Sequence, residues 1–251
     1  MKRMKYTLML VVVAFVIVSC DKKVKDNEFC LYGTIHQQQP TKFLISILDT
    51  NGYKVIDSVR TDKDGDFELR VKADYPAIYK FALAENNFIM LIAQPKDKIK
   101  LTANDTAFSS NYEIKNSEAS LRLKTLNQRN MEVRKKLKSL STLLQENAST
   151  EEFEHIRQRV KEQYVLLKED ELQFTLKFID NNVGSLASLV ALYRTFDGGW
   201  LIFADDTDIY NKVLQGLKKT MPNNPQTKYL QEHIEQNQSL LNHIGDKNGT
   251  K

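Results

Sequence analysis

Phe67-Glu68-Leu69-Arg70-Val71-Lys72 decides the fold of the first half of this chain, because apolar and charged residues alternate along it. A strand with one buried face and one face in water has this period of two. Residues 43–47 repeat the pattern. Asn51-Gly52, a pair typical of a tight hairpin, joins them to a further strand expected at 53–59.

Further strand candidates follow at the same short spacing. They lie at residues 29–35, 77–84, 88–93 and 99–102. About seven short strands separated by turn residues are typical of an antiparallel sandwich. We therefore expect an antiparallel β-sandwich domain over residues 29–105.

The second half of the chain is expected to be helical, because the composition changes after Asp105. Glycine is absent until Gly184, and apolar residues recur every three or four positions over 119–144 and again over 153–178. This spacing is the period of an amphipathic helix. The break at Asn147-Ala148-Ser149-Thr150 is so short that it makes the two helices a long antiparallel hairpin.

Two local features of this hairpin can be predicted. Ser149 and Glu152 have the spacing of a capping box at the start of the second helix. Bases on the first helix should pair with acids on the second, which makes the basic cluster a partner for its own hairpin and not a binding site. The residues concerned are Arg134, Lys135, Lys136 and Lys138, opposite Glu151, Glu152, Glu154 and Glu162.

Three shorter helices complete the chain. We expect them at 185–194, 206–220 and 225–241, the last one capped by Asn224 with Pro225 at its first position. The fold class is therefore α+β. A helical region over residues 114–245 follows the sandwich, and a polar tail covers residues 246–251.

The N-terminus has the pattern of a bacterial lipoprotein signal. Three bases precede an uncharged apolar stretch at 7–18, which is shorter than the roughly 20 residues of a transmembrane helix. Ile17-Val18-Ser19-Cys20 resembles the lipobox, in which the cysteine carries lipid. We expect a signal peptide at 1–19 and a lipidated tether at 20–28, attached through Cys20. The alternative is an ordinary signal peptide with a chance cysteine at its boundary.

The charge balance argues against nucleic-acid binding. The chain has 36 basic and 32 acidic residues, a net charge of +4. Residues 1–19 contain three bases and no acid, so removing them leaves 33 bases and 32 acids. Nucleic-acid binding needs a retained basic surface, and we expect no such partner.

Two motifs look like metal sites, and neither has a complete ligand pattern. Asp62-Lys63-Asp64-Gly65-Asp66 resembles the opening of a calcium loop, but the sixth and twelfth positions hold Phe67 and Ala73 where such a loop needs Gly and Glu. We predict a hairpin turn there. His155 stands among glutamates on a helix face that we expect to be solvated. We expect no metal and no cofactor.

Two further residues are candidate site residues. Cys30 is left as a single thiol once Cys20 carries lipid, and its strand-like surroundings predict a buried residue with low reactivity. Trp200 follows two glycines in a loop. It is expected to anchor that loop in the core, and a binding surface is the alternative.

The order of these elements resembles a known family. Residues 30–35, 55–59 and 64–67 are similar to the N-terminal domain of unknown function in membrane-tethered thioredoxin-like thiol–disulfide oxidoreductase lipoproteins. Residues 116–119 resemble the start of that family's helical region. Residues 178–188 resemble a later family motif, with valine at position 183 in place of the usual proline.

The resemblance implies the sandwich, the helical region and the anchoring. In the family a thioredoxin domain follows, with a Trp-Cys-x-x-Cys redox centre; residues 244–247 resemble the linker to that domain, but no Cys-x-x-Cys motif occurs. Exchange with turnover needs an attacking and a resolving thiol, so we expect no enzyme activity.

The expected function is that of a lipid-anchored lipoprotein on the periplasmic or surface face of a Gram-negative envelope, with the outer membrane favoured over the inner. It would be a non-catalytic binding or scaffold module for an envelope protein or a small envelope ligand. Two alternatives stay open. One is an accessory subunit of a thiol–disulfide exchange system whose thioredoxin domain is on another chain; the other is a degenerate relative.

Overall fold

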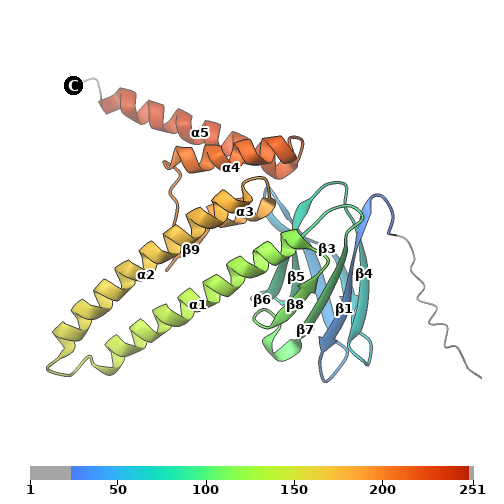
Figure 1. Cartoon of the computed structure of the whole chain (residues 1–251), viewed down its shortest axis with the longest axis horizontal. Coiled ribbons are helices and arrows are strands. Elements are labelled where there is room, and N and C mark those ends of the chain that lie inside the picture. Colours follow the sequence, from blue (N-terminus) through green and yellow to red (C-terminus); the bar gives the residue numbers. More distant parts are fainter. Residues whose placement is uncertain (1–23, 249–251) are drawn as a thin grey trace, which may run out of the picture.

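The computed structural model describes residues 24–248 and has the expected α+β fold (Figure 1). Two four-stranded sheets form the first half, with strand orders β4-β1-β7-β8 and β3-β2-β5-β6. The strands are β1 (Glu28–His36), β2 (Lys42–Asp49), β3 (Gly52–Arg60), β4 (Asp66–Lys72), β5 (Ala77–Ala84), β6 (Asn87–Ala93), β7 (Lys98–Asn104) and β8 (Tyr112–Lys115). A 3-10 turn, Asp105–Ala107, joins the last two.

The alternating strands bury their apolar faces between the sheets, as expected. Phe67 of β4 stacks on Phe81 of β5 at a centroid distance of 5.4 Å, and Phe81 stacks on Phe43 of β2 at 5.2 Å. Phe108, just after the 3-10 turn, fills the space beside Phe43 at 5.1 Å. Burying aromatic rings against each other across the two sheets supplies much of the stabilising apolar area. The hairpin predicted at Asn51-Gly52 is confirmed, because β2 and β3 pair in antiparallel register up to Asp49 and Gly52.

The sandwich departs from the prediction in two respects. It is not wholly antiparallel, because β1 pairs in parallel with β7, with Leu31 beside Ile99. Strand direction leaves no trace in an alternating pattern, so the sequence could not distinguish the two arrangements. A strand absent from the prediction, β8, pairs with β7 through Ile114 and Leu101. It has only four residues and lies just beyond the change of composition.

The helices are α1 (Glu118–Glu146), α2 (Phe153–Asn182), α3 (Leu186–Leu192), α4 (Thr207–Thr220) and α5 (Pro225–Asn248). The antiparallel hairpin of α1 and α2 leaves the sandwich as a long arm, and α4 and α5 lie on the far side of α2 from α1 (Figure 1). A small hairpin of β9 (Thr195–Phe196) and β10 (Gly199–Trp200) connects α3 to α4. The last helix runs on to Asn248, past the end predicted at residue 241.

Hydrogen bonds at the starts of α1 and α5 are among those that join the helical region to the sandwich. At the start of α1 the Ser120 hydroxyl accepts from the Ile92 backbone N–H at 3.1 Å and donates to its carbonyl at 2.9 Å, so the helix satisfies an edge group of β6. At the start of α5 the Asn224 side chain donates to the Pro76 carbonyl at 2.7 Å and accepts from the Gln226 N–H at 2.9 Å. The predicted Asn224 cap is thus confirmed, and it also fastens α5 to the sandwich.

The connection between α1 and α2 differs from the prediction. No described side chain caps α2, whose N-cap residue is Glu152, so the capping box at Ser149 is wrong. The Thr150 hydroxyl instead donates to the Asn147 carbonyl at 2.9 Å. This bond closes a turn, and the helix begins after it, at Phe153. The predicted pairing between bases and acids is also wrong: across residues 24–248 none of those four bases forms an ion pair with those acids.

Helix α5 is long, but its sequence is strongly polar. Among the described residues no helix combines the length and the apolar character that crossing a bilayer requires.

Candidate functional site

Trp200 lies at the end of the β9–β10 hairpin and is exposed. Asp197 and Gly198 form the turn with φ of +50° and +83°, the left-handed geometry that a two-residue hairpin loop needs. Phe196 and Leu201 point into a small core with residues of the α1–α2 arm, and both are buried. The core position expected for Trp200 is therefore wrong, because its neighbours anchor the loop and leave Trp200 54% exposed.

Trp200 packs against a cluster of aromatic side chains. The Tyr193 ring, at the end of α3, meets the Trp200 ring edge-on with 6.3 Å between centroids. The Tyr193 hydroxyl and Nδ1 of His233 on α5 are joined by a hydrogen bond of 2.7 Å. Tyr210 of α4 and Tyr229 of α5 complete the cluster. Burial, with the neighbouring Tyr210 and Tyr229, raises the pKa of Tyr193 well above its ordinary value, so its hydroxyl stays protonated.

A second large aromatic residue is exposed close by in the sequence. Phe203 is 54% exposed, three residues after Trp200, while Leu201 and Ile202 between them are buried. The Phe203 N–H donates to the Asp206 carboxylate at 3.0 Å, which fixes the chain where α4 begins. Trp200, Phe203 and the 39%-exposed Tyr229 are defined here as the Trp200 surface. Large aromatic residues on a loop held by a rigid scaffold are typical of protein-binding surfaces.

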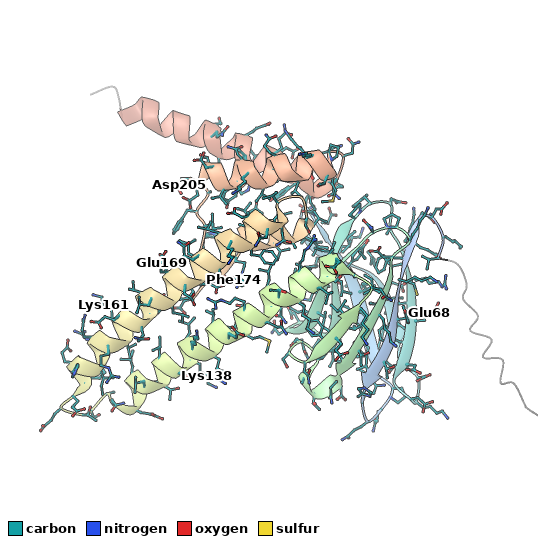
Figure 2. The ribbon with its side chains drawn as sticks, viewed as in Figure 1. Glu68, Lys138, Lys161, Glu169, Phe174 and Asp205 are labelled. Carbon is teal, nitrogen blue, oxygen red and sulfur yellow. The ribbon has the colours of Figure 1, made fainter. Side chains whose placement is uncertain are left out.

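A buried ion network holds the base of this loop. Glu171 of α2 accepts from Nε of Arg129 on α1 at 2.6 Å and forms a second ion pair with Arg194, which directly precedes β9. Phe174, labelled in Figure 2, lies one turn further along α2, with the two guanidinium groups 4.9 and 5.7 Å from its ring centroid. The Arg194 carbonyl accepts from the Leu201 N–H at 3.1 Å, so the network fixes both ends of the hairpin.

Cys30 is buried as expected, but not between the sheets. It lies on the outer face of its sheet, in register with Arg70 on β4 and Lys98 on β7, and it is 5% exposed. Two bases therefore lie beside Cys30 on the neighbouring strands, although the run 29–35 of its own strand contains no Lys, Arg or His. Burial raises the pKa of the Cys30 thiol, and Glu68 adds to the rise. Cys20, the predicted lipidation residue, lies outside the described residues.

The two rejected metal motifs hold no metal-binding arrangement. The Asp62 carboxylate accepts from the N–H groups of Asp64 and Asp66, both at 2.9 Å, and Gly65 has φ of +84°. These bonds close a turn that links two different sheets and is not the expected hairpin. His155 lies exposed on α2. Over residues 24–248 no cluster of three His, Cys, Asp or Glu side chains could hold a metal ion.

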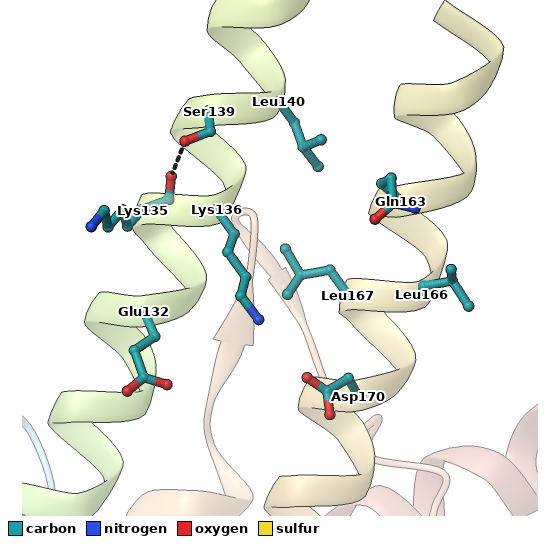
Figure 3. Close-up of a pocket in the computed structure, with 9 residues that line it drawn as sticks. All are labelled: Glu132, Lys135, Lys136, Ser139, Leu140, Gln163, Leu166, Leu167 and Asp170. Carbon is teal, nitrogen blue, oxygen red and sulfur yellow. Dashed lines mark hydrogen bonds between the residues drawn. The ribbon is translucent and has the colours of Figure 1, made fainter.

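The arm carries a groove of about 720 Å³ between α1 and α2. Figure 3 shows Leu140, Leu166 and Leu167 among its lining residues, with the β9–β10 hairpin behind the two helices. Glu132 and Asp170 offset Lys135 and Lys136 at its rim. The groove therefore has no net charge to select a ligand, and the Trp200 surface is the stronger candidate site.

Comparisons of the chain with protein-family models, with curated proteins and with solved structures give no match.

Proposed function

We propose that the chain is a lipid-anchored, non-catalytic binding module of a Gram-negative cell envelope, and that its Trp200 surface binds a protein partner. One observation carries the second part. Trp200 and Phe203 are each more than half exposed on a segment whose intervening residues Leu201 and Ile202 are buried. Large aromatic side chains on a rigid support lose little conformational entropy when a partner binds over them.

The anchoring part of the proposal is supported by the sequence. Residues 17–20 match the lipobox pattern, and the charged stretch that follows Cys20 suits a tether between lipid and fold. Two or more acyl chains hold a protein at a membrane where one would not. The partner would then be an envelope protein, on the periplasmic or surface side, with the outer membrane favoured.

A photo-crosslinking residue placed at position 203 tests the binding proposal in living cells. Position 165 is the matched control, because Val165 is 57% exposed, also apolar, and lies on the α1–α2 arm. We expect the probe at 203 to capture one reproducible envelope protein that the probe at 165 does not. Identical capture from both positions, or none from 203, would contradict the proposal.

A Cys20→Ala variant tests the anchor separately. It should no longer incorporate labelled fatty acid and should leave the membrane fraction or remain uncut. Undiminished labelling of this variant would show that the lipobox interpretation is wrong.

A further inference from the structure

Two residues of the Trp200 surface, Trp200 and Phe203, lie in an acidic segment of an otherwise balanced chain. Residues 195–211 contain four aspartates and no Lys, Arg or His. Outside the predicted signal peptide the chain has 33 bases and 32 acids, so this excess is local. All four carboxylates are exposed: Asp197, Asp205, Asp206 and Asp208. Asp205 is labelled in Figure 2, beside the start of α4 on the side away from the sandwich.

The protein does not neutralise these charges itself. In the part of the chain that the structure describes, none of the four aspartates forms an ion pair. The bases that flank the segment are already engaged. Arg194 pairs with the buried Glu171, and Lys212 pairs with Asp180 at 2.5 Å.

Two of these aspartates raise the pKa of neighbouring tyrosine hydroxyls. After burial, the charge of Asp206 is the cause that raises the pKa of Tyr210. Likewise burial raises the pKa of the Tyr164 hydroxyl, and Asp197, which accepts a hydrogen bond from this hydroxyl at 3.1 Å, adds to the rise. Both tyrosine hydroxyls therefore stay protonated.

We infer that the Trp200 surface takes a cationic segment of its partner, one in which lysine or arginine side chains lie over the exposed rings and reach the surrounding carboxylates. This inference rests on the proposed function and specifies the partner's chemistry. A cation over an aromatic face is attracted by the negative face of the ring, and tryptophan is the best ring for it. Charged hydrogen bonds to the aspartates would add orientation.

The chain offers a direct spectroscopic reporter, because Trp200 is its single tryptophan. The full-length chain in a non-ionic detergent is titrated with a short peptide of alternating lysine and alanine, and separately with one of alternating glutamate and alanine. We expect a saturable change of tryptophan fluorescence with the lysine peptide, weakened by added salt, and none with the glutamate peptide.

Charge-matched variants test whether the aspartates contribute to binding of the lysine peptide. Asp205→Asn with Asp208→Asn should weaken binding of the lysine peptide by about five-fold, the scale of two partly screened ion pairs. Glu85→Gln with Glu113→Gln changes the net charge equally on the sandwich, where both residues are exposed, and should leave binding unchanged. The inference is overturned if both peptides bind alike, if neither binds, or if the aspartate pair binds like the unaltered chain.

The two proposals can fail separately. Capture of a partner from position 203 without lysine-peptide binding would refute the cationic preference and leave the binding function standing. Lysine-peptide binding without any capture would refute the proposed function in the envelope.

Discussion

Glu171→Gln tests the claim that buried charges hold the Trp200 loop in place. The Glu171 side chain is 2% exposed, and its two partners Arg194 and Arg129 are 10% and 15% exposed. Glutamine keeps the volume of glutamate, so no cavity forms and the effect is electrostatic. It leaves Arg194 buried without a carboxylate, while Arg129 keeps Asp170 at 2.7 Å.

Removing one partner of a buried ion pair costs about 3–5 kcal/mol. Because Arg129 retains Asp170, we expect the lower end, about 3 kcal/mol. With a urea m-value of about 3 kcal/mol per molar, the unfolding midpoint should fall by about 1 M. The assay is urea unfolding followed by far-ultraviolet circular dichroism, which reports on the helices.

Asp170→Asn is the matched control. Asp170 contacts the same Arg129 but is 59% exposed, so its loss should cost less than about 1 kcal/mol. The Leu201 N–H, which bonds to the Arg194 carbonyl, should also exchange with deuterium faster in Glu171→Gln than in Asp170→Asn. Equal midpoints for the two variants would refute this prediction, because the expected difference comes from the burial of Glu171 and the exposure of Asp170.

Three further predictions concern other parts of the molecule. Gly65→Ala should destabilise the fold by about 2 kcal/mol or more, because φ is +84° and a Cβ would meet a β1 carbonyl oxygen at 2.2 Å. Gly52→Ala is the control: its φ is +112° but a Cβ there would meet open space, so it should cost about 1 kcal/mol. Equal urea midpoints for the two variants would contradict this. Cys30 should react with a thiol reagent far faster in urea than in the folded chain, because burial raises its pKa; fast labelling of the folded chain would be evidence against this. The hydrogen bond from Arg129 lowers the pKa of Asp170. This carboxylate therefore contributes stability above its ordinary pKa of about 4, and that stability is lost as pH falls through the lowered value. Asp170→Asn should remove this part of the acid dependence of unfolding.

The sequence predicts the elements of this fold better than their pairing. Alternation located strands such as β4, which exposes one face to water, and the three-and-four spacing located the helices. The parallel contact between β1 and β7 joins segments about seventy residues apart. Nothing local records such a contact, since its energy comes from burial between sheets that form only when the whole domain folds.

The candidate site was predicted only in part. Two glycines before Trp200 marked the loop, but the sequence could not show that Phe196 and Leu201 would take the core positions. The ion network was missed because charged residues on a helix are usually solvated. One signal was available: Glu171 occupies the apolar spacing between Leu167 and Phe174, where a charge needs a buried partner.

The central claim is that the Trp200 surface binds a partner, and the affinity of the captured protein for variants of this surface tests it most directly. Trp200→Ala should weaken binding at least about thirty-fold, as loss of an aromatic interface hot spot does. Tyr75→Ala is the control, since Tyr75 is 40% exposed and lies next to the sandwich. The account predicts a large loss for the first variant and none for the second; equal affinities for both would contradict it.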